Sequence, residues 1–522
     1  MSINDKHFPD IPISFRIRVK ISIFGENSKF MTEKFSNELY DQMIEWLFGQ
    51  FPSFQKVGVS AYKPGLGNIK SFDKLLGEPH RAYKVIHVAG TNGKGSVSNM
   101  LASSLASCGY KVGLYTSPHI LDFRERMRCR WEKELNYISR EEVWNFVSIW
   151  RNDFEKLDLS FFEITTAMAF FWFKQVGVDV AIIETGLGGR LDSTNIISPE
   201  LSIITNIGLD HCDILGTSLA EIAFEKAGII KASVPVVIGE SDEETADVFR
   251  EKVMSVNNNS LELLTFADQQ MSMQDTDDNM LGLGGDFLYL LEHLDMKGEY
   301  QEKNLRTVLV ALSKLSKSGS ELGNVIKSSS KQEIMEAIMD TASRMEFRGR
   351  WEEVWLEDNI RAIFDIGHNS HGLKYNFRQL GKILDLGEIK NLIIVYGAAS
   401  DKDVEEIFSL FPTMAQLIFT NAQGKRAVPA KQLYTRYLES RLRPDNKTLE
   451  NDGHRNNYMV DDAQNVRYVE NIANVVDEVF NVMKIKGLCD EDTLVYFGGS
   501  TFVIAEILKN DKFSIKKSRK IC

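Results

Sequence analysis

Cysteine is scarce in this sequence. Among 522 residues there are 5 Cys, and they are far apart, with neither a CxxC pair nor a zinc-ligand spacing. They are Cys108, Cys129, Cys212, Cys489 and Cys522. This distribution argues against a zinc site and favours a reduced, cytoplasmic compartment.

Long apolar runs and an excess of positive charge are also missing. The longest apolar run, residues 167–173, stops at Lys174 and is far shorter than the roughly 20 residues that a membrane helix needs. Residues 1–30 contain no apolar stretch of signal-peptide length. Asp and Glu number 73 against 61 Lys and Arg, a net charge of -12. We therefore expect no membrane partner, no export signal and no nucleic-acid partner.

The remaining composition, 43% hydrophobic and 26% charged, is typical of a globular protein, and the length favours two or three domains. Apolar, β-branched runs alternate with helical patterns, which predicts an α/β fold with a parallel sheet covered on both faces. Predicted strands cover 84–89, 112–116, 178–184, 201–206 and 234–239, with helices at 95–108, 140–154 and 218–230. A second α/β set has strands at 360–365, 391–397, 416–421 and 493–499, and polar loops are expected at 269–285 and 443–457.

The segment KVIHVAGTNGKGSVSNML, which begins at Lys84, predicts a phosphate-binding loop between a strand and a helix. Glycines allow backbone N–H groups to approach phosphate oxygens, the helix N-terminus adds positive potential, and Lys94 supplies a point charge. The loop departs from the usual P-loop pattern, because Val88 occupies the first glycine position and Gly95 separates Lys94 from Ser96. We expect the loop residues Gly90, Thr91, Asn92, Gly93, Lys94, Gly95 and Ser96 to hold a nucleotide.

Three further segments, 116–128, 184–195 and 205–216, follow predicted strands and carry polar groups. Ligands bind at such strand ends in open α/β sheets. Glu184 is placed as a Mg²⁺-binding carboxylate would be, or as a capping residue. Taken alone, Ser117 is typical of a turn, His211 of a structural histidine, and Lys226 of a helix lysine whose amine reaches solvent.

The combination of GTNGKGS, TSPHILDFRERMR, ETGLGGRLDSTN, TNIGLDHCDILG, AFEKAGIIK and FDIGHNSHG resembles one family. This is the folylpolyglutamate synthase/dihydrofolate synthase branch of the Mur-type peptide ligases. The motifs run in the expected order from about residue 57 to 505, and Asn92 is similar to the form in bacterial bifunctional enzymes. The resemblance implies a P-loop Mur-ligase-type N-terminal domain with a parallel sheet and a smaller Rossmann-like α/β C-terminal domain.

The resemblance also implies an ATP-dependent ligation of L-glutamate to 7,8-dihydropteroate and to folates such as tetrahydrofolate, through an acyl phosphate. Lys94, Glu184, His211 and Lys226 would be catalytic. Two Mg²⁺ ions would be held by Ser117, Glu184, His211 and Lys226, with Lys226 carbamylated.

Further site residues follow from the same resemblance. Substrate contacts are expected from Ser160, Phe161, Phe162, Glu163, Leu191, Asp192, Ser193 and Ser500, with help from Asp401 and Asp403 in binding glutamate. Nucleotide contacts are expected from Asn304, Arg350, Asp365 and His368. The family's Pro-Gly-Arg reads Arg348-Gly349-Arg350 here, and its Asp-Gly-Ala-His-Asn-Pro reads Asp365-Ile366-Gly367-His368-Asn369-Ser370, so the charged and imidazole positions are kept.

We expect three segments: 1–30 as a dispensable extension outside the family pattern, 31–343 as the ATP-binding domain and 348–522 as the C-terminal domain. A monomer is expected. The alternatives are a ligase with only one of the two activities, another Mur-type amide ligase, or a non-catalytic P-loop module. About 50 residues before the loop's approach leave no room for the UDP-binding domain of a cell-wall ligase.

Overall fold

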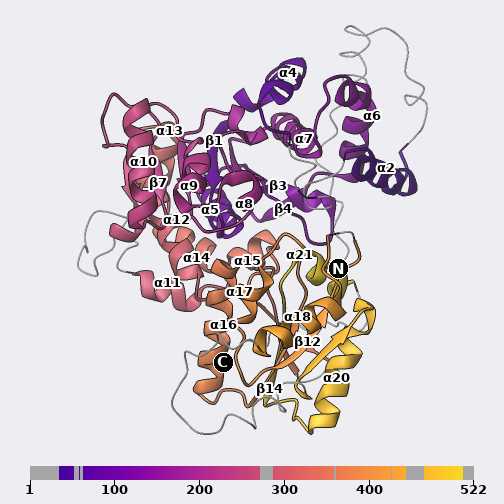
Figure 1. Ribbon diagram of the computed structural model, residues 1–522. Coiled ribbons are helices and arrows are strands. Elements are labelled where there is room, and N and C mark those ends of the chain that lie inside the picture. The colour runs from indigo at the N-terminus through magenta and orange to yellow at the C-terminus, as the bar shows by residue number, and fades with distance from the viewer. Residues whose placement is uncertain are drawn as a thin grey trace.

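Two β-sheets, one in each of two stacked bodies, organise the chain (Figure 1). The computed structural model describes residues 35–51, 58, 63–270, 286–357, 360–424, 426–442 and 464–509. The expected extension 1–30 and loop 443–457, and all but the first two residues of the expected loop 269–285, lie outside the described residues.

The first sheet has eight strands in the order β4-β3-β2-β5-β1-β6-β7-β8. All neighbouring pairs are parallel except β2–β3 and β3–β4. The strands are β1 (Lys84–Ala89), β2 (Val112–Tyr115), β3 (Met127–Trp131), β4 (Glu134–Tyr137), β5 (Val180–Glu184), β6 (Leu201–Ile204), β7 (Val236–Ile238) and β8 (Leu264–Phe266).

Helices cover both faces of this sheet. One face packs against α5 (Lys94–Ser107), α11 (Phe287–His293), α12 (Gln301–Lys317), α13 (Glu321–Ser328), α14 (Lys331–Met339) and α15 (Thr341–Met345). The other is covered by α2 (Asn37–Gln50), α4 (Gly67–Leu75), α6 (Arg140–Lys156), α7 (Phe161–Val176), α8 (Cys212–Leu215), α9 (Leu219–Ala227) and α10 (Glu243–Val256).

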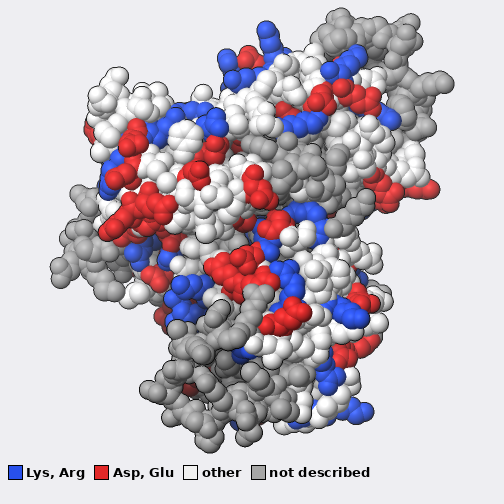
Figure 2. All heavy atoms as spheres, viewed as in Figure 1, with Lys and Arg blue, Asp and Glu red and all other residues white. Residues whose placement is uncertain are grey.

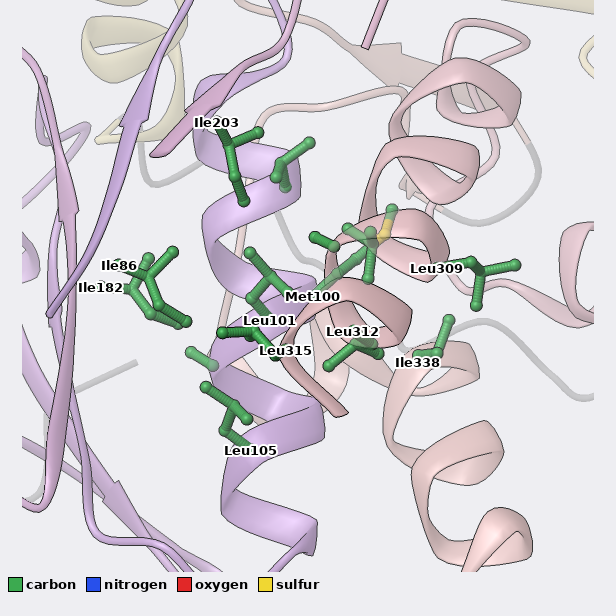
Figure 3. Close-up of a cluster of buried hydrophobic side chains, with 14 of the residues drawn as sticks. Ile86, Met100, Leu101, Leu105, Ile182, Ile203, Leu309, Leu312, Leu315 and Ile338 are labelled. Carbon is green, nitrogen blue, oxygen red and sulfur yellow. The ribbon is translucent and has the colours of Figure 1, made fainter. Parts of the chain in front are cut away.

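The core of the first body lies between the sheet and α5. Figure 3 shows Leu101 and Leu105 of α5 beside Leu315 of α12, with Ile86 and Ile182 of the strands to their left. Because these side chains are fully buried, the N-terminal end of α5 is held at a fixed place beside the end of β1. This packing positions the predicted phosphate loop.

The second sheet has six strands in the order β13-β12-β11-β14-β10-β9, and only β9 is antiparallel to its neighbour. The strands are β9 (Glu352–Leu356), β10 (Ile360–Phe364), β11 (Asn391–Tyr396), β12 (Gln416–Thr420), β13 (Val466–Val469) and β14 (Thr493–Gly498). The helices α16 (Ser370–Asp385), α17 (Val404–Phe408) and α18 (Ala430–Leu442) lie on one face, and α20 (Val475–Lys486) and α21 (Thr501–Leu508) lie on the other.

The predicted fold class, with two α/β bodies and parallel central strands, is confirmed. The strands β3, β4, β8, β9 and β13 and several helices, among them α7, α10 and α12, were not predicted. Residues 116–128 were expected only to follow a strand. On the face shown in Figure 2, acidic and basic side chains are interspersed. No helix among the described residues is long and apolar enough to cross a membrane.

Candidate functional site

Four neighbouring strands bring the predicted segments to one edge of the first sheet. The strands β2, β5, β1 and β6 are adjacent and parallel, so their carboxyl ends point the same way. Ser117 follows β2, Glu184 ends β5, the phosphate loop 90–96 follows β1, and Asp210 lies in the segment after β6. Residues far apart in the sequence therefore share one site.

The phosphate loop needs glycine at two positions. Gly90 has φ +144°, and a Cβ there would lie 1.8 Å from Thr205 Oγ1. Gly93 has φ +82°, and a Cβ there would lie 2.2 Å from Asn304 Oδ1. At both glycines, the loop backbone therefore lies closer to Thr205 and Asn304 than it could if the residue carried a Cβ atom. The same close approach lets the loop's N–H groups reach a phosphate.

Two lysine amines meet at one carbonyl of this loop. Lys94 Nζ donates to Gly90 O at 2.9 Å and to Thr91 O at 3.1 Å, and Lys226 Nζ donates to Gly90 O at 3.0 Å. Burial lowers the pKa of Lys94, and burial together with the charge of Lys94 lowers the pKa of Lys226 to about 7. The surface position of Lys226 considered from the sequence alone is therefore wrong: its side chain points inward, because α9 packs against the loop.

Glu184 lies beside these lysines. Its side chain is buried, and burial raises its pKa to about 7 although Lys94 and Arg350 act in the opposite direction. The backbone N–H of Ser117 donates to the carboxylate. Oε2 has no hydrogen-bond partner among the described residues. A buried carboxylate oxygen without a partner is suited to bind a cation.

His211 and its neighbour Asp210 connect the two bodies. Asp210 accepts from Lys402 Nζ at 2.5 Å and lies 3.4 Å from His368 Nε2, and both partners belong to the second body. Although burial acts to raise it, the pKa of Asp210 is held well below its usual value by His368, His211 and Lys402. Burial lowers the pKa of His211 to about 3, so the imidazole is neutral. Among the described residues, no group of three or more His, Cys, Asp or Glu side chains has an arrangement that could by itself hold a metal ion.

A cavity of about 400 Å³ lies between the two bodies on one side of the phosphate loop. Many of the predicted residues line it: Gly90, Thr91, Lys94, Ser117, Ser160, Phe161, Phe162, Leu191, Asp192, Ser193, His211, Lys226, His368 and Ser500. The cavity walls also contain Arg126, Lys402 and Arg426. The space is thus bordered by aromatic rings from the first body and by cations from both.

The segment Ser160–Glu163 contributes mainly its rings. Ser160 and Glu163 form a capping box at the N-terminus of α7, and Glu163 is not among the cavity-lining residues. Phe161 is buried against Phe48, with ring centroids 4.8 Å apart. Phe162 packs against Gly186, where a Cβ would lie 2.4 Å from the ring. The structure therefore places Phe162 at the cavity wall and uses the Glu163 carboxylate within the helix cap.

A second cavity, about 40 Å³, lies on the other side of the loop. It contains the predicted nucleotide residues Asn92, Gly93, Ser96, Asn304, Arg350 and Asp365. Asp365 accepts from Tyr300 Oη at 2.7 Å and from the backbone N–H of Trp351 at 2.8 Å. Gly95 lines neither cavity but lies near Glu184 and Phe347. The acidic residues proposed for glutamate are engaged elsewhere, Asp401 with Arg426 and Asp403 in the cap of α17.

Comparison with known proteins agrees with this arrangement. The model of the Mur ligase middle domain matches residues 88–312. The dihydrofolate synthase/folylpolyglutamate synthase of Bacillus subtilis is 33% identical over 414 residues, which are 76% of this chain and 88% of that protein. This chain belongs to the dihydrofolate synthase/folylpolyglutamate synthase family.

Solved structures of the family agree with the fold. Folylpolyglutamate synthase from Thermotoga maritima has a TM-score of 0.63 and 27% identity, and the match covers 90% of this chain and 96% of that one. Escherichia coli FolC in complex with DHPP and ADP has a TM-score of 0.64 and 25% identity, and the match covers 90% and 97% of the two chains. The resemblance noted from the motifs is confirmed.

Several site residues of this family member were missed by the sequence analysis. Arg126 ends a short 3-10 helix (Phe123–Arg126) just before β3, and its guanidinium is 5.4 Å from the Phe161 ring centroid. Lys402 and Asn369 come from the second body and contact Asp210. Asp210 precedes the predicted His211, and Asn369 follows the predicted His368. Both belong to recognisable motifs, but nothing in their spacing along the sequence predicts that they pair.

Proposed function

We propose that this protein is an ATP-dependent amide ligase that joins L-glutamate to 7,8-dihydropteroate, giving dihydrofolate, and to folates such as tetrahydrofolate, giving folylpolyglutamates. The observation that carries this proposal is the pair of cavities on the two sides of the phosphate loop. The smaller is lined by the residues expected to contact a nucleotide, and the larger, with aromatic rings in its wall, suits a flat aromatic acceptor. Lys94 and Lys226 line the larger cavity, and both donate to the Gly90 carbonyl of the loop.

In the first step, the acceptor carboxylate attacks the γ-phosphorus of ATP, which forms an acyl phosphate and releases ADP. Both reactants are anions, so cations must hold them together and stabilise the charge on the phosphoryl oxygens. Lys94 and the N-terminus of α5 supply positive charge for the phosphates of the nucleotide. Arg126 and Lys402 supply it around the acceptor.

In the second step, the neutral amine of L-glutamate attacks the acyl carbon, phosphate leaves with the electrons of the C–O bond, and the nitrogen loses one proton. The cationic wall formed by Lys402 and Arg426, with Ser500 nearby, is suited to glutamate carboxylates.

The family implies Mg²⁺, and the residues present fit it. Glu184 offers a buried oxygen without a partner, His211 offers a neutral imidazole, and Ser117 lies next to Glu184. We propose these three as ligands. When bound, Mg²⁺ neutralises phosphate charge and polarises the phosphoryl oxygens.

We propose that Lys226 is carbamylated and supplies a ligand for a second Mg²⁺. With its pKa lowered to about 7, a large fraction of the amine is neutral near neutral pH. A neutral amine attacks the carbon of CO₂ and loses a proton to leave a carbamate anion. The carbamate would also relieve the repulsion between Lys226 and Lys94, because it replaces a positive group with a negative one.

The protein's organisation is part of the same proposal. We propose domains at 31–343 and 348–522, a dispensable segment at 1–30, a monomer, small-molecule partners only and a cytoplasmic location. The separate cores of the two sheets support the domain division. The four described cysteines are free thiols, which supports a reducing compartment.

Release of inorganic phosphate from ATP tests the proposed function. Reactions contain 7,8-dihydropteroate or tetrahydrofolate, each with and without L-glutamate. We expect rapid release only when acceptor, L-glutamate, ATP and Mg²⁺ are all present, with the glutamylated products detected by mass spectrometry. ATP turnover that is indifferent to the acceptor would favour a non-catalytic P-loop module, and use of one acceptor alone would favour a single-activity ligase.

A further inference from the structure

A histidine lies in the centre of β1, where its neighbours on the same strand face are apolar. His87 is fully buried between Val85 and Ala89, which also belong to the core. Its Nε2 is 2.9 Å from Thr194 Oγ1, and Thr194 Oγ1 is 2.5 Å from Asp192 Oδ1. The three side chains form a continuous chain of hydrogen bonds that leads from the core to the wall of the larger cavity.

The hydrogen-bond partners of Asp192 determine which atom donates and which accepts at each step of this chain. Its carboxylate accepts from three backbone N–H groups, those of Gly186, Leu187 and Thr194. Burial raises the pKa of Asp192, but these groups can only donate and act to lower that pKa, which favours the carboxylate form. The Thr194 hydroxyl must then donate to Asp192 and accept from His87, so Nε2 of His87 carries the proton.

His87 is suited to a fixed donor role. Burial, with a smaller effect of Lys231, lowers its pKa to about 3, so the imidazole stays neutral. Nδ1 has no hydrogen-bond partner among the described residues. A polar ring with an unpaired nitrogen in a core position costs stability, which indicates that its one hydrogen bond has a use.

The hydrogen bonds of Asp192 shape the cavity wall. Oδ2 accepts from Gly186 N at 2.9 Å and from Leu187 N at 2.8 Å. Gly186 in turn lies against the Phe162 ring. Gly186, Leu187, Asp192 and Phe162 all line the larger cavity. The orientation of the Asp192 carboxylate therefore sets the position of the wall that faces the aromatic side of the cavity.

We propose that His87 is a positioning residue for the acceptor pocket: through Thr194 it holds the Asp192 carboxylate, and with it the Gly186–Leu187 wall, in the shape that receives the acceptor ring. This inference rests on the proposed function, because the acceptor is the one named there. The hydrogen bonds of the relay end at Gly186, Leu187 and Thr194 and do not include Lys94, Glu184 or Lys226, so we expect it to affect acceptor binding more than the chemical step.

Steady-state kinetics with 7,8-dihydropteroate tests the relay. Thr194→Val keeps the size of the side chain and removes its hydroxyl, and His87→Leu removes the donor. We expect each to raise KM for the acceptor about tenfold while kcat and KM for ATP change less than about twofold. The conservative variants Thr194→Ser and His87→Gln keep a hydroxyl and a donor, and we expect them to restore KM to within about threefold of the wild-type value.

Ser202→Ala is the matched control. Ser202 is also fully buried, pairs with His87 in the strand register, and donates to Ile229 O rather than to the relay. We expect its KM to match the wild type. Thermal unfolding of every variant identifies any loss of folded protein. Unchanged acceptor KM in folded Thr194→Val would overturn the proposal. So would a fall in kcat and a rise in KM for ATP as large as the rise in KM for the acceptor.

The tautomer of His87 gives a second readout that does not depend on ligase activity. Nitrogen NMR of histidine-labelled full-length protein should show a neutral ring with the proton on Nε2, and Thr194→Val should shift that resonance while Ser202→Ala should not. A proton on Nδ1 in the wild type would overturn the relay even in an active enzyme. An inactive wild type that shows the Nε2–H tautomer would contradict the proposed function and leave the geometry of the relay supported.

Discussion

The side-chain amides of Asn92 and Asn369 exchange two hydrogen bonds across the two bodies of the protein. Asn92 Nδ2 donates to Asn369 Oδ1 at 3.0 Å, and Asn369 Nδ2 donates to Asn92 Oδ1 at 3.1 Å, although the residues are 277 positions apart. Asn92 lies in the phosphate loop, and Asn369 caps the N-terminus of α16 and also donates to Asp210. The pair therefore ties the position of the second body to the nucleotide side of the site.

Substituting Asn369 by Ser should weaken this tie and leave the helix cap in place, because Ser also caps helices well but is too short to reproduce the amide pair. We expect kcat/KM for ATP to fall about tenfold, with a decrease in melting temperature of no more than a few degrees. Initial-rate measurements at varied ATP test this. The matched control is Asn481→Ser, at an exposed position of α20, which should behave as the wild type; equal losses in both variants would contradict the role of the pair.

Lys226→Ala should reduce turnover much more than it reduces stability. Loss of a group that merely supports a metal ligand typically costs about 10–100-fold in activity or metal affinity, and loss of the ligand itself should cost at least as much. Removal of an exposed lysine is nearly neutral. Lys327→Ala, at an exposed position of α13, supplies that comparison. We expect short carboxylates such as acetate to restore part of the activity, and isotope-labelled bicarbonate to give a carbamate NMR signal in the wild type only. Wild-type turnover by Lys226→Ala would exclude the ligand role.

The pH dependence of stability should report Glu184. Its pKa is about 7 in the folded protein against 4.5 in the unfolded chain. Between these values the folded state binds the proton more tightly, so this carboxyl stabilises the fold below pH 4.5 and that contribution is lost as the pH rises to 7. The measurement is made without nucleotide and Mg²⁺. As the pH rises from 4.5 to 7, we expect the wild type to lose up to about 3 kcal/mol of its free energy of unfolding relative to Glu184→Gln.

Urea titrations at several pH values measure this difference, and the other buried carboxyl groups cancel because both proteins contain them. A difference that does not change with pH would show that folding leaves the pKa of Glu184 unshifted. The same proton must leave when a cation binds, so Mg²⁺ affinity of the nucleotide complex should increase from pH 6 to pH 8 in the wild type only.

The parallel strands could be predicted because strands buried on both faces, such as 178–184, appear in the sequence as continuous apolar runs. The hairpin of β3 and β4 could not. Arg128 and Arg130 make its first strand look exposed, yet Arg128 Nη1 donates to Met345 O at 2.6 Å and Arg130 Nη1 donates to Arg344 O at 2.5 Å. These carbonyls lie more than 200 positions away in the sequence, so no local pattern predicts the two hydrogen bonds.

The site shows the same division. The loop glycines and Glu184 could be placed from local patterns, because a strand end and a helix start define where they point. The position of Lys226 could not be predicted in this way. The helical periodicity shows on which face of α9 the side chain lies, but it does not show that this face packs against the Gly90 carbonyl, 136 positions away in the sequence. Pairs between the two bodies, such as Asp210 with Lys402, depend on how the sheets are stacked and have no signature in either segment.

The two acceptors should respond differently to changes at Asp192. Dihydropteroate carries only its aminobenzoate carboxylate, so it depends on the Gly186–Leu187 wall that Asp192 holds. A folate adds glutamate carboxylates that the cationic residues Lys402 and Arg426 can bind, so part of its affinity lies elsewhere. We expect Asp192→Asn to lower kcat/KM for dihydropteroate about tenfold more than for tetrahydrofolate.

Lys94→Ala is the matched comparison, because both acceptors pass through the same phosphoryl transfer and should lose turnover equally. Incorporation of labelled L-glutamate with each acceptor, on the same enzyme preparations, measures both ratios. If Asp192→Asn reduced the two reactions by the same factor, as Lys94→Ala should, the two acceptors would share one set of contacts. Separate losses would instead mean that the acceptor ring is held by the wall beside Phe162, while the glutamate end of a folate is held by the second body.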